Sequence, residues 1–203
     1  MTLGEGAIGS GERTDFNDKE MFTMSYKNFE KALELVKQCE DYTPGKGRTD
    51  EIIAQGEKLF GCKFSKQAKE YFKRYGWIGF GSQDFYGIST DDFSDKTCGG
   101  AIESALRDRK EFGLPKEWLC IHDFGYDGWR AFLDYGNLNK EGEPPVIVSR
   151  GMGKEFQGAN KFAEGKAEYI DRNYLTDGIF AEDFGDFLLC LVEEELERQK
   201  QEQ

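Results

Sequence analysis

The spacing of apolar residues changes once along this chain, close to Trp77, and this change constrains the fold more than any other feature of the sequence. Before Trp77 the apolar residues recur every three or four positions, which is typical of amphipathic helices. After it they gather in short aromatic runs and alternating patterns, which are typical of β-strands bounded by turns. Helices, then an antiparallel meander, then a last helix predict an α+β fold with the helices packed on one sheet.

Three helices are predicted in the first part of the chain. The first begins after Ser25, the second after Thr49 and the third at Ser65. Thr49 is a suitable N-cap because its hydroxyl can accept a hydrogen bond from a free backbone N–H group of the first turn. Gly61 ends the second helix, and Gly76 ends the third as a residue in the left-handed conformation.

Short strands are predicted after Trp77, over residues 77–80, 85–88, 118–122, 129–134 and 146–148. The first two form a hairpin around residues 81–84, and the proline before Val146 suits an edge strand or the entry to a strand. Residues 95–112 are predicted to form a helix or a loose helical crossing. The last helix is predicted from Phe180 to about Arg198, whereas residues 151–178 show no clear pattern.

The chain of 203 residues is long enough to bury a core without disulfides or a structural metal. We expect a flexible N-terminal arm over residues 1–24 and a single domain over residues 25–203. Five residues on apolar helix stripes are predicted to meet in the core: Phe72, Tyr75, Phe184, Phe187 and Leu188.

The charge of the chain excludes some classes of partner. Asp and Glu number 39 against 27 Lys and Arg, a net charge of −12, which argues against direct binding of nucleic acid. The five cysteines are widely spaced, which disfavours disulfides and zinc sites and suits a reducing cytoplasmic location. The sequence shows no signal peptide and no membrane-spanning run, so we predict a cytoplasmic protein without a membrane partner.

No motif in the sequence assigns catalytic residues, metal ligands or a cofactor. Asp123-Phe124-Gly125 resembles a kinase metal-binding triplet, and this segment can also be aligned with a calcium-binding loop. A hairpin turn accounts for it better. Gly79-Phe80-Gly81 and Gly151-Met152-Gly153 lack the third glycine of a dinucleotide loop. His122 could act as a general base, but no motif places a nucleophile beside it.

Acidic residues interleave with aromatic ones over residues 79–95, which hold four aspartates and no lysine or arginine. Carboxylates beside aromatic rings suit recognition of a basic protein. We therefore predict a partner-binding surface on a sheet edge and its loops, formed by Asp84, Tyr86, Asp91, Asp92, Asp123, Tyr126, Asp127 and Trp129. Two alternatives stay open: Tyr86 and Trp129 could be core residues, and the aspartates could merely close turns. On the surface reading, replacing Asp91 and Asp92 by lysine should leave stability nearly unchanged.

Several segments in order resemble the SUKH superfamily. Leu59-Phe60-Gly61 and Phe64 through Gly76 resemble its opening helix-turn-helix, and Asp84 through Ile88 resembles its strand that ends in tyrosine-glycine. The resemblance continues through the segments listed here: Gly113-Leu114-Pro115, Trp118 to Ile121, Asp127 to Asp134, the Pro145-Val146 strand and Phe180 to Leu188. Ser65 stands where the family usually has proline, and residues 151–178 look like an insertion.

The resemblance implies an α+β binding protein without catalytic residues. Relatives include YobK-like immunity proteins, which bind and neutralise a cognate polymorphic toxin, and cell-wall assembly regulators. We therefore expect an immunity protein whose partner is a basic toxin domain such as a nuclease, with an intracellular scaffold or regulator as the alternative. A third possibility, a small hydrolase that uses His122, needs carboxylates placed beside that histidine. The sequence does not indicate an oligomeric state.

Overall fold

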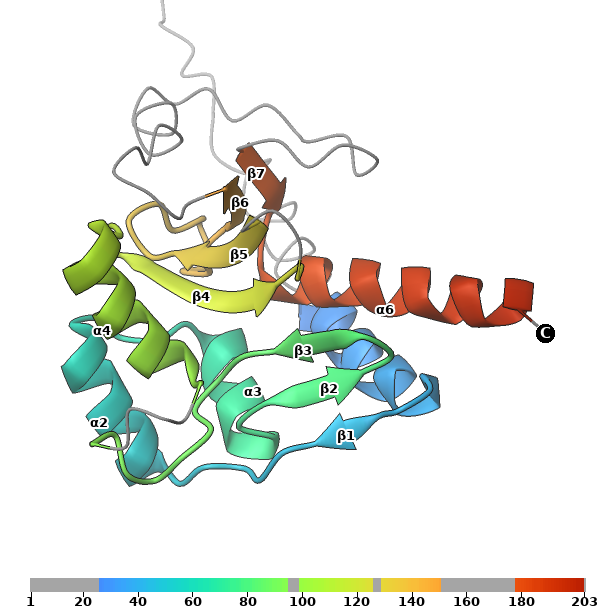
Figure 1. Ribbon diagram of the computed structural model, residues 1–203, viewed down its shortest axis with the longest axis horizontal. Coiled ribbons are helices and arrows are strands. Elements are labelled where there is room, and N and C mark those ends of the chain that lie inside the picture. Colours follow the sequence, from blue (N-terminus) through green and yellow to red (C-terminus); the bar gives the residue numbers. More distant parts are fainter. Residues whose placement is uncertain (1–25, 95–98, 126–128, 151–177, 203) are drawn as a thin grey trace, which may run out of the picture.

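The computed structural model describes residues 26–94, 99–125, 129–150 and 178–202. Within these ranges the fold is α+β, as predicted: helices pack against a seven-stranded sheet in which each neighbouring pair is antiparallel (Figure 1). None of the described helices is long and apolar enough to cross a membrane. The boundary between residues 24 and 25 stays a prediction.

The helices of the first part form where they were predicted. A helix covers residues 26–35 and continues into the short η1 (Val36–Gln38), and α2 (Asp50–Phe60) and α3 (Lys66–Arg74) follow. The hydroxyl groups of Thr49 and Ser65 cap α2 and α3 by accepting from Ile52 N and Ala68 N. Gly61 and Gly76 adopt φ values of 100° and 69°, a region that favours glycine.

The strands lie in the sheet in sequence order. They are β1 (Thr43–Pro44), β2 (Ile78–Phe80), β3 (Gln83–Phe85), β4 (Trp118–Asp123), β5 (Trp129–Asp134), β6 (Val146–Arg150) and β7 (Gly178–Ala181). The predicted hairpin is shifted, because Phe80 pairs with Gln83 and the turn therefore needs only Gly81 and Ser82. Strand β6 lies between β5 and β7, so its proline marks a strand entry and not an edge.

Two helices complete the fold: α4 (Ala101–Phe112) and α6 (Phe184–Glu202). The prediction that the last helix begins at Phe180 is wrong, since Phe180 belongs to β7 and the helix starts after Asp183. The Asp183 carboxylate accepts from Asp186 N at 3.0 Å and so satisfies a backbone group of the first turn.

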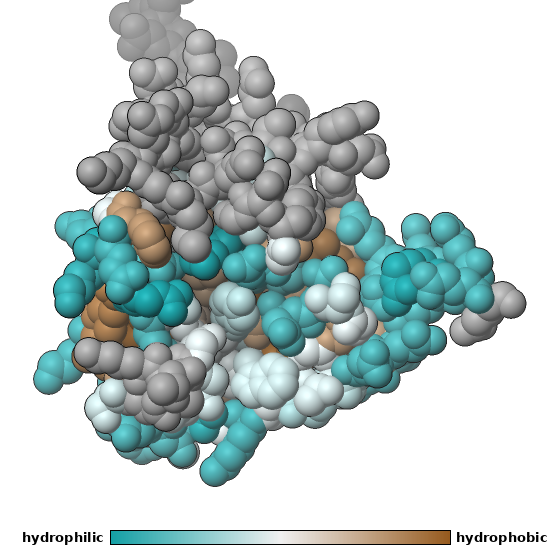
Figure 2. Space-filling view, viewed as in Figure 1, coloured by the Kyte–Doolittle hydropathy of each residue, from teal (hydrophilic) through white to brown (hydrophobic). Residues whose placement is uncertain are grey.

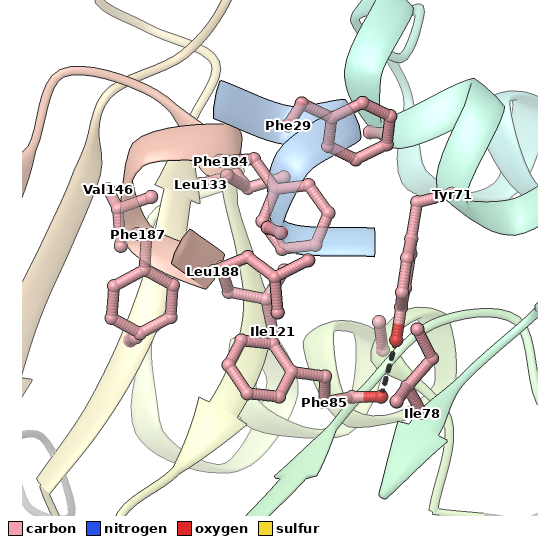
Figure 3. Packing of buried hydrophobic residues seen from close by; sticks show 14 of the residues in the cluster. Phe29, Tyr71, Ile78, Phe85, Ile121, Leu133, Val146, Phe184, Phe187 and Leu188 are labelled. Atoms are coloured by element: carbon pink, nitrogen blue, oxygen red, sulfur yellow. Dashed lines mark hydrogen bonds between the residues drawn. The ribbon is translucent and has the colours of Figure 1, made fainter. Parts of the chain in front are cut away.

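The core lies between the sheet and the helices, and α6 supplies much of it (Figure 3). Phe187 and Leu188 are fully buried, and the Phe187 ring lies 5.7 Å from that of Phe85. Phe72 and Phe184 are also in the core, as predicted, whereas Tyr75 is only partly buried against it. A smaller apolar cluster on the opposite side of the sheet contains Leu114, Trp118, Cys120, Phe132 and Ile147.

The contact between β3 and β4 is short compared with the pairing on either side of it. Phe85 and His122 are its one register pair, while β2 and β3 share three pairs and β4 and β5 share five. A β-bulge in β4 between Cys120 and His122 shifts the register of β4 against β5. We call the contact between β3 and β4 the seam, because it joins β1–β3 to β4–β7.

Candidate partner-binding site

A row of polar residues, Asp84, Asp123, Arg130 and Ser149, crosses the face of the sheet opposite the main core, with Asp84 exposed, Asp123 and Arg130 partly buried and Ser149 buried. Gly79 pairs with Asp84, and Asp123 pairs with Arg130, which in turn pairs with Ser149. Phe85 pairs with His122 in the antiparallel sense, so the next residues, Asp84 and Asp123, lie opposite each other across the seam. Successive side chains of a strand alternate between faces, which places this row opposite the core. The structure thus brings together two predicted carboxylates from distant parts of the sequence. The prediction of a sheet edge is wrong, because β3 and β4 each pair with a strand on both sides and lie inside the sheet.

Arg130 is the centre of this row. Its Nε donates to Asp123 Oδ2 at 3.1 Å, and its Nη1 donates to Asp108 Oδ2, on α4, at 2.7 Å. The Arg130 side chain is only 13% exposed and that of Asp108 3%, so these charge-assisted bonds are largely shielded from solvent. The arrangement fixes α4 against the β4–β5 hairpin and holds the Asp123 carboxylate in place.

Tyr86 lies beside this group and is half-buried against both apolar clusters. Burial, reinforced by Cys120 and the Asp123 carboxylate, raises the pKa of Tyr86 to about 12. The phenol is therefore neutral at physiological pH and can donate a hydrogen bond. Tyr86 is partly buried against the apolar clusters and partly exposed next to carboxylates, so it is not a fully buried core residue, and its contact with a partner stays a prediction.

Asp84 is the exposed carboxylate of the row. The described part of the chain shows no ion pair to its side chain, whereas its backbone carbonyl accepts from His122 Nδ1 at 2.9 Å. In the view of Figure 2, the surface over β1 to β3 has intermediate hydropathy, and hydrophilic residues cover the end of α6. This part of the surface is not an apolar patch, so a partner would be recognised by charge and hydrogen bonding.

Asp91 and Asp92 form a second group, in the loop that follows β3. Arg48, which is 9% exposed, donates through Nε to Ile88 O at 2.7 Å and through Nη2 to Ser89 O. Its Nη1 pairs with Asp91 Oδ1 at 2.8 Å. Asp91 is therefore held by a buried cation, and replacing it by lysine would set two positive groups together. The expectation that this change leaves stability unaffected needs revision.

The other predicted residues do not join the row. Asp92 accepts from Ser94 N and Ser94 Oγ at 2.9 and 2.6 Å, a local turn. Trp129 packs partly buried against the main core, so it lies on the face opposite its neighbour Arg130. Tyr126 and Asp127 lie outside the described residues.

Sequence reasoning missed the two arginines that organise these groups. Arg130 was placed in an alternating strand, but its partner Asp108 is 22 positions away on a helix. Arg48 lies between two helices with no local pattern, and its acceptors are 40 or more positions away. Spacing within one element cannot reveal contacts of this kind.

The described geometry offers little support for catalysis. His122 is fully buried, and the rings of Phe85 and Phe124 lie 5.0 and 4.6 Å from it. Burial raises the pKa of Cys39 and Cys62 to about 11 and that of Cys120 to about 12, so these thiols are not activated. Where side chains are described, no three His, Cys, Asp or Glu residues are grouped so as to hold a metal ion.

Comparison with known families agrees with the architecture. A family model described as SUKH_5, SMI1-KNR4 cell-wall, matches residues 29–164, about two thirds of the chain. No curated protein is a significant match to the sequence. The matched range begins in the first helix and includes the strands that carry Asp84, Asp123 and Arg130. Because the match covers more than half of its length, this chain belongs to the SUKH superfamily, in the SMI1-KNR4 family.

Proposed function

We propose that this SUKH protein is a cytoplasmic immunity protein that binds a cognate toxin domain and neutralises it by occlusion. The observation that carries the proposal is the polar row, in which exposed Asp84 lies opposite Asp123 and close to half-buried Tyr86. The family contains proteins of this kind and is generally non-enzymatic, so we propose binding and not catalysis.

The chemistry of the row favours a basic partner. A toxin that cleaves nucleic acid needs cationic groups to hold phosphates, and those groups are attracted by the net charge of −12 of this chain. At close range, Asp84 can accept from an arginine or lysine, and Tyr86 offers a ring edge and a hydroxyl donor. Arg130 prevents Asp123 from moving, so little conformational entropy is lost when the partner binds.

An intracellular scaffold or regulator of the same fold is the second candidate. The description of the matching family as a cell-wall family favours it. The two candidates differ in a simple respect: an immunity protein rescues cells from one particular toxin, and a regulator does not.

The test uses the toxin domain encoded beside this gene. The wild-type protein should restore growth of cells that express that domain and should bind it in vitro. Asp84→Lys should slow association about tenfold at low salt and flatten its salt dependence, because a steering charge is reversed. Glu141→Lys is the matched control, since Glu141 lies in the β5–β6 loop at the other end of the sheet.

A second variant tests the other acidic surface. Glu197→Lys reverses an exposed charge on α6. If Glu197→Lys impairs binding and Asp84→Lys does not, the partner docks on α6 and the sheet-face proposal is wrong. If no neighbouring toxin is bound or neutralised, the immunity function itself is wrong, and the regulator becomes the better candidate.

A further inference from the structure

The His122 side chain bonds across the seam where the backbone ladder is shortest. Its Nδ1 lies 2.9 Å from the carbonyl oxygen of Asp84, on β3. A carbonyl can only accept, so the imidazole must carry a proton on Nδ1. The bulge between Cys120 and His122 interrupts the regular ladder of β4, and the imidazole supplies an additional donor beside it.

The other nitrogen of the ring has no such partner. His122 Nε2 is buried and makes no hydrogen bond with any described residue. The ring stacks on Phe85, meets Phe124 edge-on and lies 6.1 Å from Phe187 of α6. A proton on Nε2 would therefore leave a cation and an unsatisfied donor among aromatic rings, which is costly.

The carboxylates of Asp84, on β3, and of Asp123, on β4, are the charged groups that act on this imidazole. From α6 the described contact is the ring of Phe187, and from the loop after β4 it is that of Phe124. Burial is the largest influence and lowers the pKa of His122, while the Asp84 carbonyl and the two carboxylates oppose it. The neutral form is thus the one that fits the folded seam.

We propose that neutral His122 is the positioning residue of the sheet face: it holds the backbone of Asp84 opposite Asp123, and its protonation loosens the seam. This inference rests on the proposed function for its biological meaning, because it adds acid-dependent release to the same site. Its physical part is the hydrogen bond from His122 Nδ1 on β4 to the Asp84 carbonyl on β3, which we call the latch, and this part concerns the free protein alone.

The direction of the pH effect follows from the shift. The folded pKa is lowered, so the neutral latch is intact above the ordinary value of about 6.5, and its contribution is lost as the pH falls below that value. Each pH unit below it can raise the open fraction of the seam by up to about tenfold, because one proton is taken up on opening.

NMR of the labelled full chain tests the latch directly, since His122 is the one histidine and gives a single set of ring signals. We expect the Nδ1-protonated neutral ring at pH 7. The amide of Tyr86, which donates to Ile121 O across the seam at 2.7 Å, should lose protection from hydrogen exchange between pH 6.5 and 5. The amide of Asp134, bonded to Pro145 O at 3.0 Å away from the seam, should keep its protection.

A ring protonated at Nε2, or parallel changes at Tyr86 and Asp134, would overturn the latch. His122→Asn keeps an N–H donor that does not titrate, so the protection of Tyr86 should become independent of pH. His122→Phe removes the donor and should lower that protection about tenfold at every pH. If His122→Phe does not fold, the wild type and His122→Asn still decide the question.

These measurements need no partner, so they separate the two proposals. If the latch is confirmed but the toxin binds Asp84→Lys as tightly as the wild type, the proposed binding face is wrong and the latch proposal stands. An intact seam at pH 5 in a protein that does neutralise its toxin would mean the reverse.

Discussion

The two halves of the sheet are stabilised in different ways. Strands β4 to β6 are five or six residues long and pair through longer ladders, with five register pairs between β4 and β5 and five between β5 and β6. Strands β1 to β3 have two or three residues each. Side chains hold this second region: Tyr71 Oη donates to Phe85 O at 2.8 Å (Figure 3), and His122 donates to the preceding carbonyl, that of Asp84.

Close packing of backbone segments also stabilises the second region, the one that contains β1 to β3. A Cβ atom on Gly87 would lie 1.8 Å from the carbonyl oxygen of Gly76, so these two segments can approach only because residue 87 is a glycine. The difference between the halves shows that short strands persist when other elements donate to their carbonyls. The half that carries Asp84 therefore depends on a few distant side chains, and the variants below test that dependence.

The largest effect is expected where both halves meet the last helix. Phe187 is fully buried and touches Phe85 on one side and Phe180 on the other. Phe187→Ala should lower the free energy of unfolding by about 3 to 5 kcal/mol, measured by urea denaturation. Leu106→Ala, at a site 38% exposed, is the control and should cost less than about 1 kcal/mol. A loss below about 1 kcal/mol for Phe187→Ala would show that α6 does not close the core.

The next effect concerns the arginine behind the loop after β3. Arg48→Met keeps most of the apolar stem but leaves the carbonyl oxygens of Ile88 and Ser89 without their donor. We expect a loss of about 2 to 3 kcal/mol, from the buried carbonyl of Ile88 and the partly buried carbonyl of Ser89. Lys73→Met, which breaks an ion pair with Asp50 whose side chains are 42% and 74% exposed, should cost at most about 0.5 kcal/mol. Equal losses in both variants would refute the special role of Arg48.

Tyr71→Phe isolates one hydroxyl group. The ring stays in the core, while the Phe85 carbonyl loses a donor at 2.8 Å. The free energy of unfolding should therefore fall by about 1 to 2 kcal/mol. Hydrogen exchange should show the loss at β3 and leave β5 unchanged. Uniform loss of protection over both halves would mean that β1–β3 does not open as a separate unit.

The smallest expected effect is a difference in pH dependence. Burial raises the pKa of Glu143, whose Oε1 accepts from Gln67 N at 3.1 Å. Glu143 therefore contributes fully to the free energy of unfolding at low pH, and this contribution is lost as the pH rises through the folded pKa. The dependence is opposite to that of His122. Glu143→Gln should make the loss of stability steeper as the pH falls from 7 to the ordinary glutamate value of 4.5, by up to about 1 kcal/mol in total. Identical slopes in urea series from pH 7 to pH 4.5 would contradict this.

Local rules predicted the helices in the first half of the chain well. Helix α2 begins after Thr49 and ends before Gly61 as expected, because caps depend on neighbouring residues. Strand β1 was missed because Thr43 and Pro44 are extended only through pairing with β2. Phe180 was assigned to the last helix because its spacing fits that stripe, yet it belongs to β7, where pairing with β6 decides the conformation.

The candidate site was predicted in part. Asp84, Tyr86 and Asp123 are brought together because sheet register aligns them, and the aromatic-acid pattern was enough to select them. Trp129 was selected by the same pattern but faces the core, since alternation along β5 places it opposite Arg130. Which of these residues contact a partner remains a prediction.

The position of α6 in the sequence has a consequence for synthesis in the cell. Phe184, Phe187, Leu188 and Val192 cover the sheet, and they lie beyond the range matched by the family model. A chain still emerging from the ribosome therefore leaves the part of its apolar sheet face that α6 covers open until residues 184–202 have been made. During that interval the nascent protein exposes surface that favours aggregation, so chaperone demand should be highest just before α6 is released.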